Sequence, residues 1–259
     1  MLKKLLKYDF KTLSHSLLPA YAISLLLSVV GNIFIRLNDL TAIFKIPMTL
    51  IVGLSLIVAI GIIFMTFIIG IINFYKQTVK DEGYLVHTLP VSKNNIITSK
   101  LITITVMEII SFLIAVVAVI ITFKVSPSKV VDIVKYLIER IGGYKLTTTL
   151  MLIGILIGQI SNTLLIYVSI SFGQKHPTNK LLYSIIYGVV IYNVTQIVTT
   201  VLYLPLLLNN SFVKALEQTV PTAKVLNITL GITIGLSLII SVVYYILTKK
   251  NLETKLNLE

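Results

Sequence analysis

The chain has no cysteine, and it has few charged residues for its length. Without cysteine it can form neither disulfides nor thiolate metal sites. Its three histidines, His15, His87 and His176, are far apart and show no HxxxH or HxxE spacing. Only 12% of the 259 residues are charged, whereas 56% are hydrophobic. A water-soluble domain of this composition could not cover its own core with polar side chains, so the bilayer is the expected solvent.

The sequence also lacks the motifs of an enzyme. No segment matches GxxxxGK[ST], so the chain has no P-loop with which to hold nucleotide phosphates. No Ser/His/Asp set, metal cluster or pair of carboxylates is spaced for hydrolysis. We therefore expect the chain not to be an enzyme and to bind no cofactor itself. A net charge of +12 would suggest nucleic acid as the partner of a soluble protein, but here lysines at the ends of apolar runs fit anionic lipid headgroups instead.

Six apolar runs reach or nearly reach the ~20 residues that cross the hydrocarbon of a bilayer. They are roughly Leu17–Ile35, Ile46–Phe74, Ile96–Phe123, Thr147–Phe172, Leu181–Leu207 and Val225–Leu247. Lipid leaves no water for unpaired backbone groups, and no run alternates with a period of two residues, so helices are expected. The predicted fold is all-α, a single multi-pass transmembrane domain over residues 1–259. Six spans put both termini on one side, and the loop Lys and Arg favour the cytoplasmic side.

Two segments outside the apolar runs are predicted to be amphipathic helices. In residues 1–16, lysines repeat every four residues beside an apolar stripe, which is typical of a helix lying in the headgroup plane. A soluble helix packed on a partner is the alternative. The stripe consists of Leu2, Leu6, Phe10, Leu13 and Leu17. In residues 124–146, apolar side chains recur at helical spacing after Pro127, and the position opposite the termini predicts an external interfacial helix.

Polar residues inside the runs are candidates for a translocation path. Glu108 is the only acid inside a predicted span, and it lies near the bilayer midplane. An ionised carboxylate there is costly, and no Lys or Arg lies at similar depth. Glu108 is therefore either protonated and bonded to a neighbouring helix, or it faces water on a substrate or proton path. Amides of the fourth and fifth spans leave the same choice between helix contact and path lining: Gln159, Asn162, Asn193 and Gln196.

The connection between the second and third runs, residues 75–95, is unusually structured for a membrane loop. The segment Lys80–Lys100 reads KDEGYLVHTLPVSKNNIITSK. It combines a helix-like stretch, a break at Pro90 and a serine, Ser92, placed to cap the next helix. A short rigid element of this kind transmits a displacement that a flexible loop would absorb. An ordinary loop rich in turn residues is the alternative interpretation.

The segment Glu82–Ser92, with the sequence EGYLVHTLPVS, resembles the motif after the second span of ABC exporter permeases of the second type. In that family an acidic residue and Gly precede a short helix that ends in Leu, followed by Pro-Val-Ser and a Lys that opens the next helix. This chain looks closest to the low-GC Gram-positive branch. Tyr84 stands where Thr is usual, and no second acid stands at His87. The six spans and the N-terminal helix agree with the family, but only the loop carries specific residues.

The resemblance implies that residues 75–95 hold a cytoplasmic coupling helix, seated on a separate ATPase subunit that binds ATP-Mg. The coupling residues would be Glu82, Gly83, Tyr84, Leu85, Leu89 and Pro90. The chain would be the transmembrane subunit of an ATP-driven exporter in the plasma membrane of a low-GC Gram-positive bacterium. It would pair with a second copy of itself or with a homologous permease. Its cargo would be amphipathic, such as an antimicrobial or bacteriocin-like peptide.

Two other functions stay open at this point. A secondary transporter or channel could use Glu108 as a proton or cation site, and transport in ATP-depleted vesicles under an ion gradient would favour it. A membrane sensor or immunity protein could sequester a peptide without moving it. Stimulation of a partner ATPase without displacement of peptide would point to that class.

Overall fold

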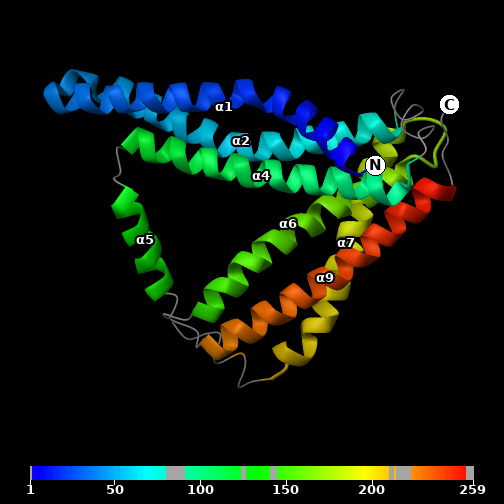
Figure 1. The fold of residues 1–259 in the computed structure, drawn as a ribbon. Helices are drawn as coiled ribbons and strands as arrows, with labels where there is room; N and C mark the ends of the chain where they lie inside the picture. Colours follow the sequence, from blue (N-terminus) through cyan, green and yellow to red (C-terminus); the bar gives the residue numbers. More distant parts are fainter. Residues whose placement is uncertain are drawn as a thin grey trace. The chain divides into compact units, whose positions relative to one another are not determined.

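The computed structural model describes residues 2–79, 91–123, 127–140, 145–209, 213 and 223–254. Every described element is helical, so the all-α prediction is confirmed for this part of the chain (Figure 1). The elements are α1 (Leu2–Leu40), the 3-10 turn η1 (Ala42–Phe44), α2 (Lys45–Val79), α4 (Lys93–Phe123), α5 (Pro127–Arg140), α6 (Lys145–Gly173), α7 (Lys180–Leu207) and α9 (Ala223–Thr254).

Six of the described helices are long and apolar enough to cross a membrane, namely α1, α2, α4, α6, α7 and α9. Each of them contains one of the six predicted apolar runs. The shortest, α7, has 28 residues, which is about 42 Å at 1.5 Å per residue. All six therefore exceed the ~30 Å of hydrocarbon and can reach the headgroups. These lengths and compositions fit a multi-pass membrane protein.

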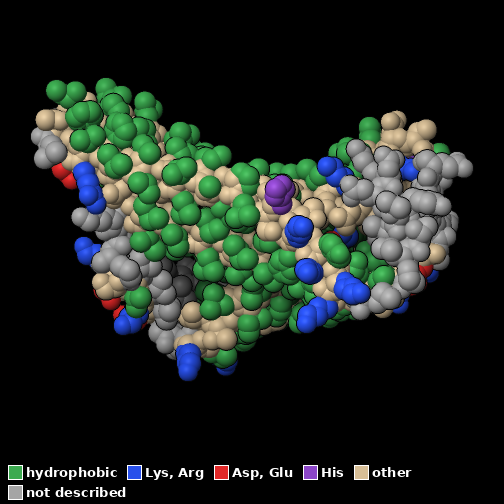
Figure 2. Space-filling model, turned by 45° about the horizontal axis from the view of Figure 1, so that its top comes forward, with side chains coloured by type: hydrophobic (Ala, Val, Ile, Leu, Met, Phe, Trp, Pro, Cys, Tyr) green, Lys and Arg blue, Asp and Glu red, His purple; other side chains and the backbone are tan. Residues whose placement is uncertain are grey.

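Many large apolar side chains are exposed, and many small polar ones are buried. Large apolar side chains such as Ile57 and Ile197 are exposed, whereas small polar ones such as Ser24 and Thr163 are buried. Hydrophobic side chains cover much of the face shown in Figure 2, and Lys and Arg gather in groups on it. Apolar surface costs nothing in lipid, while small hydroxyl residues allow helices to approach closely and to form hydrogen bonds.

The helices pack as two compact units. The first unit consists of α1, η1, α2 up to Lys76, α4 and the start of α5. The second consists of α6, α7 and α9, with the last residues of α2 and the rest of α5. Within each unit the first and third spanning helices run parallel to each other, and the second runs antiparallel.

In the first unit, α1 and α4 keep one register over their length. Ser99 Oγ donates to Asp9 Oδ2 at 2.6 Å near the start of both helices. Near their ends, Asn32 Nδ2 donates to the carbonyl oxygen of Thr122 at 3.2 Å. The partners are 90 residues apart in both pairs. The two helices therefore lie parallel without a register shift from Asp9 to Asn32, about 35 Å along the axis.

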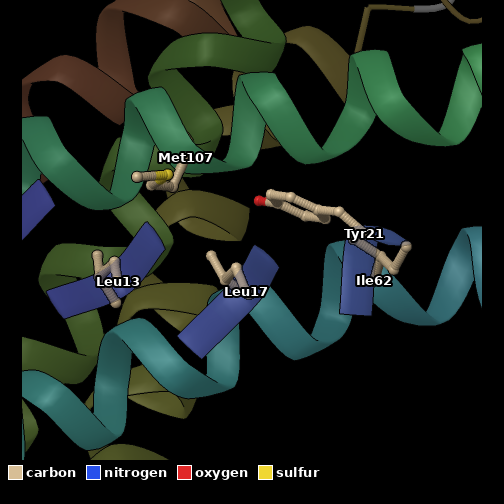
Figure 3. Packing of buried hydrophobic residues seen from close by; sticks show 5 residues of the cluster. All are labelled: Leu13, Leu17, Tyr21, Ile62 and Met107. Atoms are coloured by element: carbon tan, nitrogen blue, oxygen red, sulfur yellow. The ribbon is translucent and has the colours of Figure 1, made fainter. Parts of the chain in front are cut away.

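Helix α2 completes the first unit through a small core and a group of hydroxyls. Thr66 Oγ1 of α2 lies 2.6 Å from Ser111 Oγ of α4, which in turn lies 2.7 Å from Tyr21 Oη of α1. Apolar side chains of the same three helices pack beside this group (Figure 3). They are Leu13, Leu17, Tyr21, Ile62 and Met107. One shared hydroxyl thus joins three helices at the centre of the unit.

In the second unit, α6 and α9 form the parallel pair. Thr147 Oγ1 donates to Asn227 Oδ1 at 2.7 Å, and Asn251 Nδ2 donates to Ser171 Oγ at 3.0 Å. The partners are 80 residues apart in both pairs, so this register is constant too. A hydrogen bond at each end therefore fixes α6 on α9, as in the first unit.

Helix α7 runs antiparallel to α9. The hydroxyls of Thr195 and Tyr244 lie 2.5 Å apart, and those of Tyr203 and Thr233 also lie 2.5 Å apart. The later residue of α7 thus meets the earlier residue of α9. Only Ser184 of α7 is buried, so this helix presents most of its circumference outwards.

Both amphipathic segments are helical where the structure describes them. The N-terminal one does not end at residue 16, because α1 continues through Pro19 to Leu40. Its buried face, Asp9 with Leu13 and Leu17, packs against α2 and α4. The helix predicted within residues 124–146 is α5. The positions of these two segments in the membrane interface stay predictions.

Candidate functional site

The predicted coupling residues, Glu82, Gly83, Tyr84, Leu85, Leu89 and Pro90, lie outside the described residues. The structure does describe the two flanks of this loop, where α2 ends at Val79 and α4 begins at Lys93. Ser92 caps α4 as predicted, because its Oγ accepts the N–H of Asn95 in a long hydrogen bond of 3.4 Å. The Ser92 carbonyl accepts the same N–H at 3.0 Å.

The flank before the loop is anchored in the second unit. Gln174, which follows α6, is 3% exposed, and its Nε2 donates to the carbonyl oxygen of Thr78 at 2.6 Å. The carbonyls of a last helical turn have no partner within the helix, and Gln174 donates to one of them from outside it. The C-terminal end of α2 is therefore fixed directly before the loop.

The flank after the loop is anchored in the first unit by a buried ion pair. Lys100 Nζ lies 3.1 Å from Asp9 Oδ1, with side-chain exposures of 5% and 8%. Ser99 Oγ donates to the other carboxylate oxygen of Asp9. Taking both charges out of water costs several kcal/mol, which their attraction and the added hydrogen bond offset. The first two turns of α4 are thereby attached to the first turns of α1.

Asp9 is a packing residue that an assignment of residues 1–16 to the membrane surface does not predict. A signal for its role is present in the sequence. Asp9 stands four residues before Leu13 and eight before Leu17, so it lies on the same helical face as these two apolar residues. An acid on an apolar face indicates a buried partner of opposite charge.

A second group that the sequence did not single out closes the turn between α6 and α7. The His176 ring stacks on Tyr183 with ring centroids 3.6 Å apart, and its Nε2 lies 3.1 Å from Tyr187 Oη. Lys175 Nζ lies 4.2 Å from the centroid of the Phe172 ring. These contacts link the turn next to Gln174 to the start of α7.

The structure separates the candidate path residues into two sets. Glu108 is one of the buried residues of α4, with 7% exposure, and belongs to the first unit. Gln159 and Asn162 lie on α6, and Asn193 and Gln196 lie on α7, all in the second unit.

Three of the four amides, Asn162, Asn193 and Gln196, are exposed, and Gln159 is half-buried. Asn193 Nδ2 donates to the carbonyl oxygen of Val189 in its own helix at 2.7 Å. Amide groups at mid-span form no hydrogen bonds with lipid tails. The exposed amides therefore suit contact with protein, water or a polar part of a cargo.

Among the described residues, no group of three or more His, Cys, Asp or Glu side chains could hold a metal ion. Comparison of the chain with protein-family models, with curated proteins and with solved structures found no match. The described part of the chain holds two anchored flanks of a polar loop, a buried carboxyl in α4, and a set of exposed amides on α6 and α7.

Proposed function

We propose that this chain is the transmembrane subunit of an ATP-driven exporter in the cell membrane. Separate ATPase subunits would bind ATP-Mg and press on the loop between α2 and α4. The observation that carries this proposal is the sequence of residues 82–92, EGYLVHTLPVS, which resembles the coupling segment of second-type ABC exporter permeases. Six helices of membrane-spanning length support the same assignment.

The anchored flanks support a mechanical role for the loop. Thr78 before the loop is held by Gln174, and Lys100 after it is held by Asp9. A push on the loop would therefore act on two helices whose ends are held by these polar contacts. A second permease copy or a homologue would complete the path for an amphipathic cargo, of which an antimicrobial or bacteriocin-like peptide is the proposed example.

The proposal is tested by purifying the tagged chain from its native membranes in a mild detergent. We expect a P-loop ATPase, identified by mass spectrometry, to copurify with the parent chain. Leu85→Asp should remove the ATPase, because it replaces an apolar residue of the proposed coupling segment with a charged one. Val131→Asp on α5 is the matched control at an exposed apolar residue, and it should retain the ATPase. Absence of any ATPase from the parent preparation would refute the proposal.

A second candidate function follows from the burial of Glu108 in α4. A carboxyl held inside a spanning helix can take up and release a proton or bind a cation, as in ion-gradient-driven transporters. Transport that persists in ATP-depleted vesicles under a proton gradient would favour this function. Binding of peptide without its movement would instead favour a sensor or immunity protein.

A further inference from the structure

We propose that α1 and α4 form one strut, held against sliding by a polar clamp at each end, and that Asp9 is the positioning residue of the clamp next to the coupling loop. The near clamp consists of Asp9, Ser99 and Lys100, and the far clamp consists of Asn32 with the carbonyls of Ile121 and Thr122. The existence of the strut rests on the first unit alone. Only its mechanical use rests on the proposed function.

The near clamp fixes both the height and the rotation of α1 on α4. Asp9, Ser99 and Lys100 are 6%, 0% and 5% exposed, so water does not compete for their hydrogen bonds. The two oxygens of Asp9 accept from two neighbouring residues of α4, at 2.6 and 3.1 Å. Sliding α1 by one residue, about 1.5 Å, would break at least one of these bonds. It would leave a charged group in a dry site, which is strongly unfavourable.

The far clamp acts through the end of α4. Asn32 Nδ2 donates to the carbonyl oxygens of Ile121 and Thr122 at 2.9 and 3.2 Å. Helix α4 ends at Phe123, so both carbonyls belong to its last turn and have no partner within the helix. In a bilayer that turn needs an outside donor. Asn32 supplies it, and a slide of α1 would withdraw it.

The surfaces between the clamps interlock. Tyr21 Oη lies 2.7 Å from Ser111 Oγ, again 90 residues away. Near the far clamp, a Cβ added to Gly31 would lie 3.3 Å from the Thr122 methyl group, so α1 and α4 are closely packed there. The polar bonds at the ends and the close packing between them support the same register.

A strut of this kind would transmit a displacement of the coupling loop along the whole length of α1 and α4. Helix α4 begins at Lys93, directly after the loop, and the near clamp lies within its first two turns. A displacement of that end would move α1 with α4, and it would arrive about 35 Å away at Asn32 without loss by sliding. This use depends on the proposed function, whereas the fixed register does not.

The absence of cysteine allows a direct test with spin labels on the full chain in nanodiscs of phosphatidylethanolamine and phosphatidylglycerol. Label pairs at Lys11→Cys/Ile102→Cys and Ile33→Cys/Phe123→Cys report on the near and far ends, since all four side chains are exposed. We expect narrow distance distributions for both pairs. Asp9→Asn should broaden the near distribution and leave the far one narrow, and Asn32→Leu should do the reverse.

Two further variants keep the test decisive. Asp9→Asn with Lys100→Met removes both charges of the pair. We expect this double variant to insert and fold even if Asp9→Asn alone does not, and it should also broaden the near distribution. The charge swap Asp9→Lys with Lys100→Asp should restore the narrow distribution. A near distribution that stays narrow both in Asp9→Asn and in Asp9→Asn with Lys100→Met, or a folded swap that stays broad, overturns the proposal. These distances need neither ATPase nor cargo, so their outcome is independent of whether the exporter assignment fails.

Discussion

Tyr21 of α1 and Ser111 of α4 face each other inside the first unit, with their hydroxyl oxygens 2.7 Å apart. Both residues are buried, and Thr66 of α2 reaches the same Ser111 oxygen at 2.6 Å. In lipid no water can replace such a contact when a helix moves. This group therefore holds three helices together inside the membrane. Apolar side chains there gain little hydrophobic free energy from contact with a helix, because lipid tails are equally apolar.

Loss of the shared hydroxyl should destabilise the unit. Ser111→Ala leaves the buried Tyr21 hydroxyl without this partner, at an expected cost of about 1–3 kcal/mol in the free energy of unfolding. A double-mutant cycle with Tyr21→Phe should give a coupling energy of about 0.6–1.7 kcal/mol. Steric trapping in bicelles measures both. Tyr203→Phe, which removes an exposed hydroxyl contact with Thr233, is the control, and an equal cost for it would count against the buried group.

Close helix approach at Gly70 gives a second stability prediction. A Cβ at this position would lie 2.6 Å from Cγ1 of the buried Ile104, a side chain that is branched at Cβ and cannot easily turn away. Gly70→Ala should therefore cost about 1–3 kcal/mol, and Ile104→Ala in the same chain should relieve the clash. The control is Gly61→Ala on the same helix, since no atom lies within 4 Å of a Cβ there. Equal thermal stability of the two alanine variants in detergent would show the contact to be unimportant.

The buried ion pair should respond differently to single and double changes. Asp9→Leu takes the carboxylate away from the buried Lys100 ammonium and should cost about 3–5 kcal/mol. Asp9→Leu with Lys100→Met removes both charges of the pair and should recover most of this loss. Glu253→Gln breaks the exposed pair with Lys249, 3.9 Å apart, and should change stability by at most about 0.5 kcal/mol. Unfolding measurements in which the double variant is no more stable than Asp9→Leu would contradict this explanation.

The sequence predicted the spanning helices well but not the contacts between them. Apolar runs are long and uninterrupted, and each of the six lies inside a helix of the structure. The N-terminal segment was harder, because Leu13 and Leu17 form an apolar stripe that would suit lipid or a neighbouring helix equally well. The structure buries both of them against α2 and α4.

The partners of polar residues could not be predicted, because a sequence shows which face of a helix is unusual but not which helix it meets. Asp9 and Lys100 are 91 residues apart, and nothing local links them. Ser92 was predictable as a cap, since its partner is only three residues away. For the candidate path, the sequence found Glu108 and the four amides but could not divide them between two packing units.

Glu108→Gln separates the two candidate functions. If the carboxyl is protonated and bonded to a neighbouring helix, the amide, of the same shape, should leave both insertion and ATP-driven transport close to the parent level. In an ion-gradient-driven transporter the same change removes the ionisable group and should abolish transport. Uptake of a fluorescent amphipathic peptide into inside-out vesicles measures the difference. A monodisperse variant with no transport would support an ionisable role for Glu108 and favour the ion-gradient-driven function.

The most direct measurement asks what touches residues 80–90 in native membranes. A single cysteine at His87 can be labelled with a benzophenone maleimide on inside-out vesicles and irradiated, because the chain has no other cysteine. If residues 80–90 contact a separate ATPase, we expect an adduct between this chain and a P-loop ATPase. We expect none when the cysteine is placed at Val131 on α5. Labelling of the His87 position from outside intact cells, or irradiation that yields no ATPase adduct, would contradict it.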